Sequence, residues 1–191
     1  MRHFGSPLSL ALCVYLNKSI RGIAVKLELA NIRQLAEVLN LVNLAYRGEI
    51  GWTKETDIVQ GNRATESEIE RAILDPNSHF LVYVENNKLL ACIRIEAKQE
   101  EAHIGLFAVD PQLQGKGIGK MVLAAAEKYA ASNLYSKKFV MAVVSQRPEL
   151  IAYYERRGYS RTGFIEEYPV HLNVGIPKTN ELTVEYLAKY T

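Results

Sequence analysis

The sequence predicts an α/β fold built on a mixed sheet, and three observations carry this prediction. Strand-like and helix-like segments follow in the order strand, two helices, three strands, helix, strand, helix, two strands. Residues 138–145 form a near-continuous apolar run, which indicates a strand covered on both faces. A hydrophobic fraction of 48% in 191 residues suits one domain with a substantial core.

The first half of the chain supplies one strand and two helices. Residues 24–29 alternate weakly and are rich in Val and Leu, so we expect a strand there. From Asn31 the apolar residues recur with a helical period that stops at Gly48. The next segment lacks any sustained period and predicts a loop around Trp52, the only tryptophan of the chain. Thr65, with a glutamate three residues later, forms a capping box and starts the second helix.

The second half supplies the remaining strands and two further helices. We expect strands at 79–85, 88–97, 103–109, 138–145, 158–165 and 182–189. A helix follows the glycine-rich loop, because Ile118, Val122 and Tyr129 share one helical face. A short helix should begin at Pro148, and Gly158 suits the residue just past its end.

Composition excludes several classes of function. The formal net charge is +2, and Lys and Arg are matched by Asp and Glu along the chain, so nucleic-acid binding is not expected. The four histidines lack metal-ligand spacing, so we expect no metal. The two cysteines, Cys13 and Cys92, are too few for a disulfide framework, and free thiols suggest a cytoplasmic location.

The N-terminal residues 1–22 are expected to be an extension of a domain that spans 23–191. Their apolar run, residues 8–16, is too short to span a bilayer, so no membrane partner is expected. The run faintly resembles a signal peptide but lacks a convincing cleavage site. We therefore favour an extension that is disordered or packed on the surface.

The stretch 110–120, DPQLQGKGIGK, has the character of an anion-binding loop. It joins a strand to a helix whose first-turn amides lack intrahelical partners, and glycines let an anion approach the backbone. The P-loop string GxxxxGK[ST] is absent, and the dinucleotide fingerprint would need a glycine where Lys120 stands. Spacing therefore excludes both common nucleotide loops.

The loop instead matches [QR]-x-x-G-x-[GA] through Gln112, Gly115 and Gly117. The string LFAVDP precedes it, and IAYYERRGY (151–159) follows in the expected order. In these three elements the chain resembles the GNAT superfamily of N-acetyltransferases. The resemblance implies a mixed, mostly antiparallel central sheet of about seven strands with helices on both faces, and acetyl-CoA as co-substrate.

The resemblance also implies roles for individual residues. Backbone groups of one strand would pair with the pantetheine arm: Phe107, Ala108 and Val109. The loop would hold the pyrophosphate: Gln114, Gly115, Lys116, Gly117, Ile118, Gly119 and Lys120. Ser145 stands in a region where the family often places an asparagine that contacts the pantetheine. Tyr154 would be the general acid that protonates the departing CoA thiolate, although a packed tyrosine, or an exchange of roles with Tyr153, is the alternative.

The acceptor side is less determined. Glu96, His103 and Glu49 are candidates for a general base, although a lone Glu or His on a strand is more often a salt-bridge partner. Arg47, Glu49 and Trp52 belong to the segment that borders the acceptor in this superfamily, although Trp52 is equally explained as a core residue.

The function expected from the resemblance is transfer of an acetyl group to a primary amine of a small molecule or peptide by direct attack. One alternative is an acyl-CoA-binding sensor without turnover. Another is a protein-modifying enzyme that docks its partner through residues 166–181. A homodimer is common in the family, but no feature of the sequence supports one.

Overall fold

The computed structural model describes residues 25–191, so the expected extension at 1–22 and Cys13 lie outside the described residues. The strands are β1 (Glu28–Leu29), β2 (Val59–Gln60), β3 (Ser78–Glu85), β4 (Lys88–Lys98), β5 (Glu101–Val109), β6 (Lys138–Val144), β7 (Ser160–Glu167), β8 (Ile176–Pro177) and β9 (Thr183–Tyr190). The α-helices are α2 (Leu35–Arg47), α3 (Glu66–Leu74), α4 (Ile118–Asn133) and α5 (Pro148–Glu155). The 3-10 turns are η1 (Ile32–Gln34), η2 (Pro111–Leu113) and η3 (Val170–Leu172).

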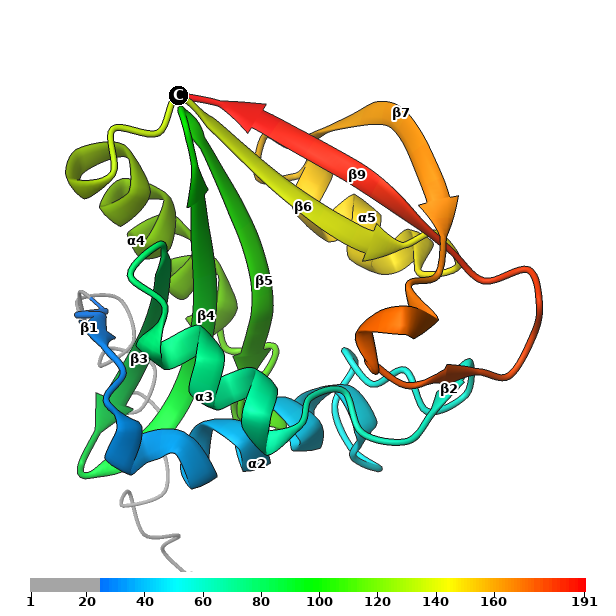
Figure 1. Ribbon diagram of the computed structural model, residues 1–191, viewed down its shortest axis with the longest axis horizontal. Coiled ribbons are helices and arrows are strands. Elements are labelled where there is room, and N and C mark those ends of the chain that lie inside the picture. The colour runs from blue at the N-terminus through cyan, green and yellow to red at the C-terminus, as the bar shows by residue number, and fades with distance from the viewer. Residues whose placement is uncertain (1–24) are drawn as a thin grey trace, which may run out of the picture.

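The strands form a seven-stranded sheet in the order β1-β3-β4-β5-β6-β9-β7, and β2 pairs with β8 separately. Neighbours in the large sheet are antiparallel except β5 and β6, which are parallel. Helices α2 and α3 cover one face, and α4 and α5 lie behind the other (Figure 1). The expected fold class, a mostly antiparallel sheet of about seven strands between helices, is confirmed.

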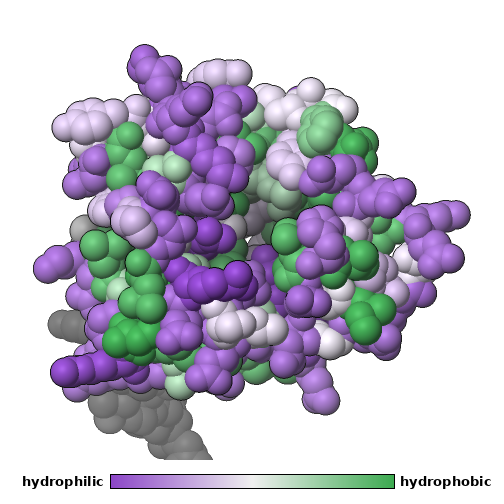
Figure 2. Space-filling model, in the orientation of Figure 1, coloured by the Kyte–Doolittle hydropathy of each residue, from purple (hydrophilic) through white to green (hydrophobic). Residues whose placement is uncertain are grey.

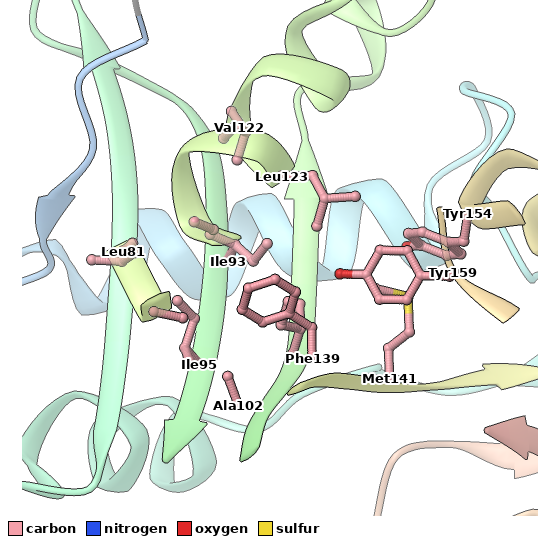
Figure 3. Packing of buried hydrophobic residues seen from close by; sticks show 14 of the residues in the cluster. Leu81, Ile93, Ile95, Ala102, Val122, Leu123, Phe139, Met141, Tyr154 and Tyr159 are labelled. Atoms are coloured by element: carbon pink, nitrogen blue, oxygen red, sulfur yellow. The ribbon is translucent and has the colours of Figure 1, made fainter. Parts of the chain in front are cut away.

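The pleat of the strands divides the core into two layers. On β3, Leu81 packs with the layer under α4 and α5, whereas Phe80 and Val82 pack with the layer under α2 and α3. Figure 3 shows the first layer, where Leu123 of α4 lies above Ile93 of β4 and the other apolar side chains of the sheet. Because both faces of the central strands are covered by helices, residues of either alternation are apolar, and the strands appear in the sequence as nearly continuous apolar runs.

The sheet opens between β5 and β6. These strands pair only where Glu101–His103 meets Lys138–Val140, and farther along they diverge (Figure 1). The register of β5 against β4 shifts between Cys92 and Arg94, which marks a bulge, and Leu106 within it has φ of 44°. The Cys92 thiol donates to the Leu106 carbonyl at 3.7 Å and so supports the bulge.

Several element boundaries differ from the sequence prediction. The first strand is only two residues long, and the following helix begins as a 3-10 turn that Asn31 caps. The expected loop after α2 contains β2, which pairs with β8 inside residues 166–181. Thr65 accepts from the Glu68 amide at 3.3 Å as expected, whereas the Glu68 carboxylate lies 3.7 Å from the Arg63 guanidinium. Tertiary pairing of the loops, invisible in local periodicity, explains the added strands.

Within residues 25–191, no helix is both long and apolar enough to cross a membrane.

The two-layer core makes a prediction about Ile93, which is 0% exposed. Replacing Ile93 with Ala should lower the free energy of unfolding by about 2–5 kcal/mol, because the change leaves a cavity between β4 and α4. Urea unfolding measures this loss. The matched control is Leu74→Ala at the exposed end of α3, where a change within about 0.5 kcal/mol is expected. Equal losses in the two variants would contradict the assigned core.

Candidate active site

A cavity of about 310 Å³ lies at the opening of the sheet. Figure 2 shows the surface hollowed near the middle of the molecule, with hydrophilic residues on the left of the hollow and hydrophobic residues on its right. The cavity is lined by Tyr46, Trp52, Thr53, Phe107, Val109, Gln114, Gly115, Gly117, Gly119, Lys120, Leu150, Tyr153, Tyr154 and Arg157. Among these lining residues the charged ones, Lys120 and Arg157, are both basic. The walls are therefore largely aromatic and apolar, and the charge among the lining residues is positive.

The glycine loop forms one side of this cavity. Gly115 has φ of 78° and Gly117 has φ of 88°, both in the left-handed region that favours glycine. Gly117 is the N-cap of α4, and a Cβ added at either glycine would meet no atom within 4 Å, so the space above the backbone is open. The free amides of the first turn and the positive end of the helix dipole then suit a phosphate group.

Tyr153 connects α5 to the first turn of α4. A Cβ added at Gly119 would lie 2.9 Å from the Tyr153 hydroxyl, so the two helices approach this closely only with glycine at 119. The Arg157 guanidinium stacks over the Tyr153 ring at 3.2 Å from its centroid, and the centroids of the Trp52 and Tyr153 rings lie 5.3 Å apart. The Tyr153 hydroxyl therefore faces the glycine loop.

Tyr154 points elsewhere. Its ring packs edge-on against Tyr153 at 5.2 Å and Tyr159 at 5.9 Å between centroids, and Figure 3 shows Tyr154 beside Tyr159 at the border of the core. Burial raises the pKa of Tyr154 well above its ordinary value of 10.0, so the phenol stays protonated at neutral pH. Tyr154 also lines the cavity. A protonated phenol in this position can donate a hydrogen bond to a group bound there.

The strand edge beyond the bulge faces the same cavity. Phe107 and Val109 line it, while Ala108 packs in the opposite layer, as alternation along a strand requires. Since β6 has already diverged, backbone groups of this edge are open on that side. The backbone N–H and C=O groups of this edge can therefore form strand-like hydrogen bonds with an extended ligand.

Ser145 follows directly after β6 and has an unsatisfied side chain. Its amide donates to the Thr183 carbonyl at 2.9 Å, but its buried hydroxyl has no partner in the described part of the chain. It is not among the cavity-lining residues. A buried hydroxyl without a partner is costly, and a ligand group would satisfy it.

Arg47 is occupied within the protein. Its guanidinium pairs with Glu55 at 2.7 Å and donates to the Val174 carbonyl at 2.9 Å and the Gly61 carbonyl at 3.1 Å. Arg147 adds a second cation at 4.0 Å from Glu55. These groups are buried and hold the loops together, so Arg47 lies outside the cavity lining.

Of the two remaining residues predicted at the acceptor side, Trp52 lines the cavity and Glu49 does not. Trp52 is 40% exposed and lines the cavity, so its ring forms part of the wall and does not lie in the core. Glu49 is exposed and is not among the lining residues. The 48–58 segment therefore meets the cavity through Trp52 and Thr53.

Glu96 and His103 lie at the wrong end of the opening to reach the cavity lining. They face each other across β4 and β5, where β5 still pairs with β6. Glu96 pairs with Arg94 at 3.3 Å and with Lys98 at 3.1 Å, and His103 lies 3.1 Å from the Glu101 carboxylate. The bulge, which the sequence does not signal, is what places only the later residues of β5 at the site.

Sequence reasoning missed several residues of the site. Tyr46, Thr53, Leu150 and Arg157 line the cavity, and the side chain of Gln114 faces it as well. Arg157 follows Tyr153 by four residues, and this spacing was the available signal for their stacking. Within residues 25–191, no group of three or more His, Cys, Asp or Glu is placed to hold a metal ion.

The fold and the site together define a class of protein in which an opened sheet, a bulged strand and a glycine loop surround a cavity that a protonated tyrosine also lines. The sequence model of the family described as "Acetyltransferase (GNAT) family" matches residues 36–159. The chain belongs to this family, as the sequence resemblance predicted.

Similar proteins were found in curated sequences and in solved structures. The chain is 36% identical over 77 residues to an S-(2-succino)cysteine N-acetyltransferase of Bacillus subtilis, a match that covers 40% of this chain and 47% of that protein. The chain thus spans about half the length of this relative. A spermidine N-acetyltransferase from Vibrio cholerae, solved with CoA and spermine, has a TM-score of 0.66 at 18% identity, over 87% of this chain and 95% of that one.

A GNAT-family acetyltransferase from Streptococcus pneumoniae has a TM-score of 0.63 at 16% identity, over 87% of this chain and 99% of that one. At these identities the two solved structures show a shared fold.

The buried tyrosine makes a prediction about alkaline stability. The pKa of Tyr154 is raised in the folded state, so its stabilisation is present below the unfolded pKa of about 10 and is lost as the pH rises toward the folded value. Tyr154→Phe should flatten the fall of unfolding free energy above pH 10 by up to about 1.4 kcal/mol per pH unit. Denaturant unfolding at several alkaline pH values measures the slope. Tyr135→Phe, at an 80% exposed site, should leave it unchanged.

Arg47 and Glu49 allow a second comparison. Arg47→Met leaves Glu55 buried without its closest cation and should cost about 3–5 kcal/mol of stability. Glu49→Gln changes an exposed side chain and should cost less than about 0.5 kcal/mol. Chemical denaturation of both variants checks this. A mild effect of Arg47→Met would mean that its buried contacts do not stabilise the loops.

Proposed function

We propose that the protein transfers an acetyl group from acetyl-CoA to a primary amine by direct attack, with Tyr154 as the general acid. One observation carries the proposal. A single cavity is lined both by Gly115 and Gly117, above which the space is open, and by the protonated phenol of Tyr154. Membership in the acetyltransferase family supports the same reaction.

Different elements of the chain bind different parts of acetyl-CoA. The loop amides from Gln114 to Lys120 hold the pyrophosphate, and Lys120 adds a positive charge in the lining. The edge of β5 from Phe107 to Val109 pairs with the pantetheine arm as with an added strand, and its N–H groups polarise the thioester carbonyl. Ser145 stays a candidate for a contact with the same arm through its unpartnered hydroxyl, although it lies outside the cavity lining.

The chemical step needs one proton donor and one proton acceptor. The neutral amine forms the new C–N bond, the C–S bond breaks, and Tyr154 gives its proton to the departing thiolate. The amine's own proton leaves to water, because neither Glu96 nor His103 lines the cavity, Glu96 is held in an ion pair with Arg94, and His103 lies 3.1 Å from the Glu101 carboxylate. Glu55 is likewise held by Arg47.

The acceptor class follows from the charge of the lining. None of the lining residues is acidic, so a polycation such as the spermine bound by the Vibrio cholerae enzyme would meet no carboxylate on these walls. A relative named for S-(2-succino)cysteine, an amino acid with additional carboxylates, supports the opposite choice. We infer an acceptor that carries a carboxylate beside its amine, with Trp52 contacting its apolar part.

The reaction is tested by binding and turnover measured separately. Calorimetry should show that the chain binds CoA, and Tyr154→Phe should bind it with nearly unchanged affinity. The same variant should lose about 10²–10⁴-fold in kcat, measured as thiol release, because the proton donor is removed. Tyr135→Phe is the matched control and should keep full turnover.

The acceptor is tested with a panel of S-(2-succino)cysteine, free amino acids, aminoglycosides, peptides and spermidine. Carboxylated amines should give the highest kcat/KM. A preference for spermidine would overturn the proposed acceptor class. Lack of CoA binding would overturn the reaction itself, and CoA binding without turnover on the whole panel would favour a sensor.

A further inference from the structure

A short segment, Gly51–Lys54, spans the opening of the sheet and is held from both halves. We name it the wall segment, because Trp52 and Thr53 within it line the cavity. Gln114, in the connection after β5, contacts it from one half, and Arg147, in the connection after β6, contacts it from the other. The wall segment therefore ties together two strands that no longer pair with each other at this level.

Arg147 provides a fixed anchor. Its guanidinium donates to three successive carbonyls of the wall segment, those of Trp52 at 2.8 Å, Thr53 at 3.1 Å and Lys54 at 3.0 Å. Arg147 is buried, and it also pairs with Glu149 on its own helix. Since Pro148 starts α5 directly after it, this anchor belongs to the helix that carries Tyr154.

Gln114 provides a second anchor whose position depends on the glycine loop. Its Oε1 accepts from the Trp52 amide at 3.0 Å, and its Nε2 donates to the Thr53 hydroxyl at 2.8 Å. The Thr53 hydroxyl in turn donates to the Ala45 carbonyl at 2.9 Å, so its orientation is set. A Cβ at Gly51 would lie 2.8 Å from Gln114 Oε1, so glycine there permits this close approach.

The same amide of Gln114 also donates to the Val109 carbonyl at 3.2 Å, on the strand edge that faces the cavity. One side chain thus contacts the strand edge and the wall segment, and it stands next to Gly115 in the chain. Gly115 and Gly117 both have a positive φ, and glycine lets the backbone of the loop adjust around a bound anion at little steric cost. Because Gln114 adjoins the loop and bonds to the wall segment, an adjustment of the loop reaches Trp52 and Thr53.

We propose that Gln114 is a positioning residue that couples occupancy of the CoA site to the order of the wall segment, so that acetyl-CoA and the amine bind cooperatively. The inference rests on the proposed function, which places the cofactor phosphates at the glycine loop. Binding of CoA fixes Gln114, Gln114 fixes Trp52 and Thr53, and the amine meets a preformed wall. By linkage, a bound amine strengthens CoA binding by the same factor.

Trp52 makes the coupling measurable without knowledge of the acceptor. It is the only tryptophan of the chain, and it is part of the wall segment itself. Its ring is 40% exposed, so acrylamide has access to it. Quenching of tryptophan fluorescence by acrylamide therefore reports the accessibility of the wall segment, and a variant that binds CoA without the Gln114 side chain separates ordering of the segment from direct shielding by CoA.

The experiment titrates the full chain with CoA and measures acrylamide quenching, with CoA affinity determined in parallel by calorimetry. In the wild type CoA should lower the quenching constant. Gln114→Ala should still bind CoA but lose this protection. Gln60→Ala, an exposed glutamine on β2 outside the cavity lining, should retain it.

A second variant guards against misfolding of the first. Thr53→Val keeps the volume of the side chain but removes the hydroxyl that accepts from Gln114, and it should lose the protection in the same way. Protection of wild-type size in a folded Gln114→Ala or Thr53→Val would overturn the coupling, as would CoA binding to the wild type without any change in quenching. Absence of CoA binding to the wild type would instead overturn the proposed function, and the coupling with it.

Discussion

The separation of β5 from β6 is the constraint on which the site depends. The strands pair over only a few residues, and the bulge at Leu106 bends β5 before its last residues. The divergence leaves a strand edge without a neighbour, which in most proteins invites aggregation. Here the edge lies inside a cavity, beside the glycine loop and Tyr154, and under the proposed function the pantetheine arm would take the place of the missing strand. The supporting contact is modest, a thiol of Cys92 against a carbonyl of the bulge. Burial raises the pKa of this thiol to about 12, so Cys92 stays protonated and able to donate.

The loops around the opening of the sheet are held in place by buried charged side chains. Arg47 and Arg147 both approach Glu55, and their remaining donors go to backbone carbonyls of the surrounding loops. Arginine suits the task because its guanidinium presents several donors in a fixed plane. Arg47 and Arg147 are thus occupied by contacts within the protein, and the charged residues that line the cavity are Lys120 and Arg157. A cavity lining without carboxylates is expected to favour amines that also carry a negative charge over amines that carry only positive charge.

The sequence predicted the order of elements and the family well, because both rest on local patterns. The glycine loop and the segment around Tyr154 are contiguous strings, and the period of the strands reflects their burial. It predicted poorly whatever depends on the bulge. Leu106 is an ordinary apolar residue at a positive φ, so nothing in the string signals that β5 bends there, and Glu96 and His103 were consequently expected near the cleft. The contacts of Arg147, which do not involve the bulge, were also not predicted from the sequence. An arginine before a proline suggests an exposed helix start, and only the tertiary structure brings three distant carbonyls to it.

The contact between Gly119 and the Tyr153 hydroxyl limits how this chain and its relatives can vary. The missing Cβ at 119 and the oxygen at 153 occupy the same small space, since a Cβ there would lie 2.9 Å from that oxygen. An alanine at 119 is compatible with a phenylalanine at 153 but strained with a tyrosine, whereas a glycine accepts either ring. Among homologous sequences the two positions should therefore vary as a pair, with alanine at the first found alongside loss of the hydroxyl at the second. Such a pairing would link the first turn of α4 to α5, the helix that carries Tyr154, through a single atom.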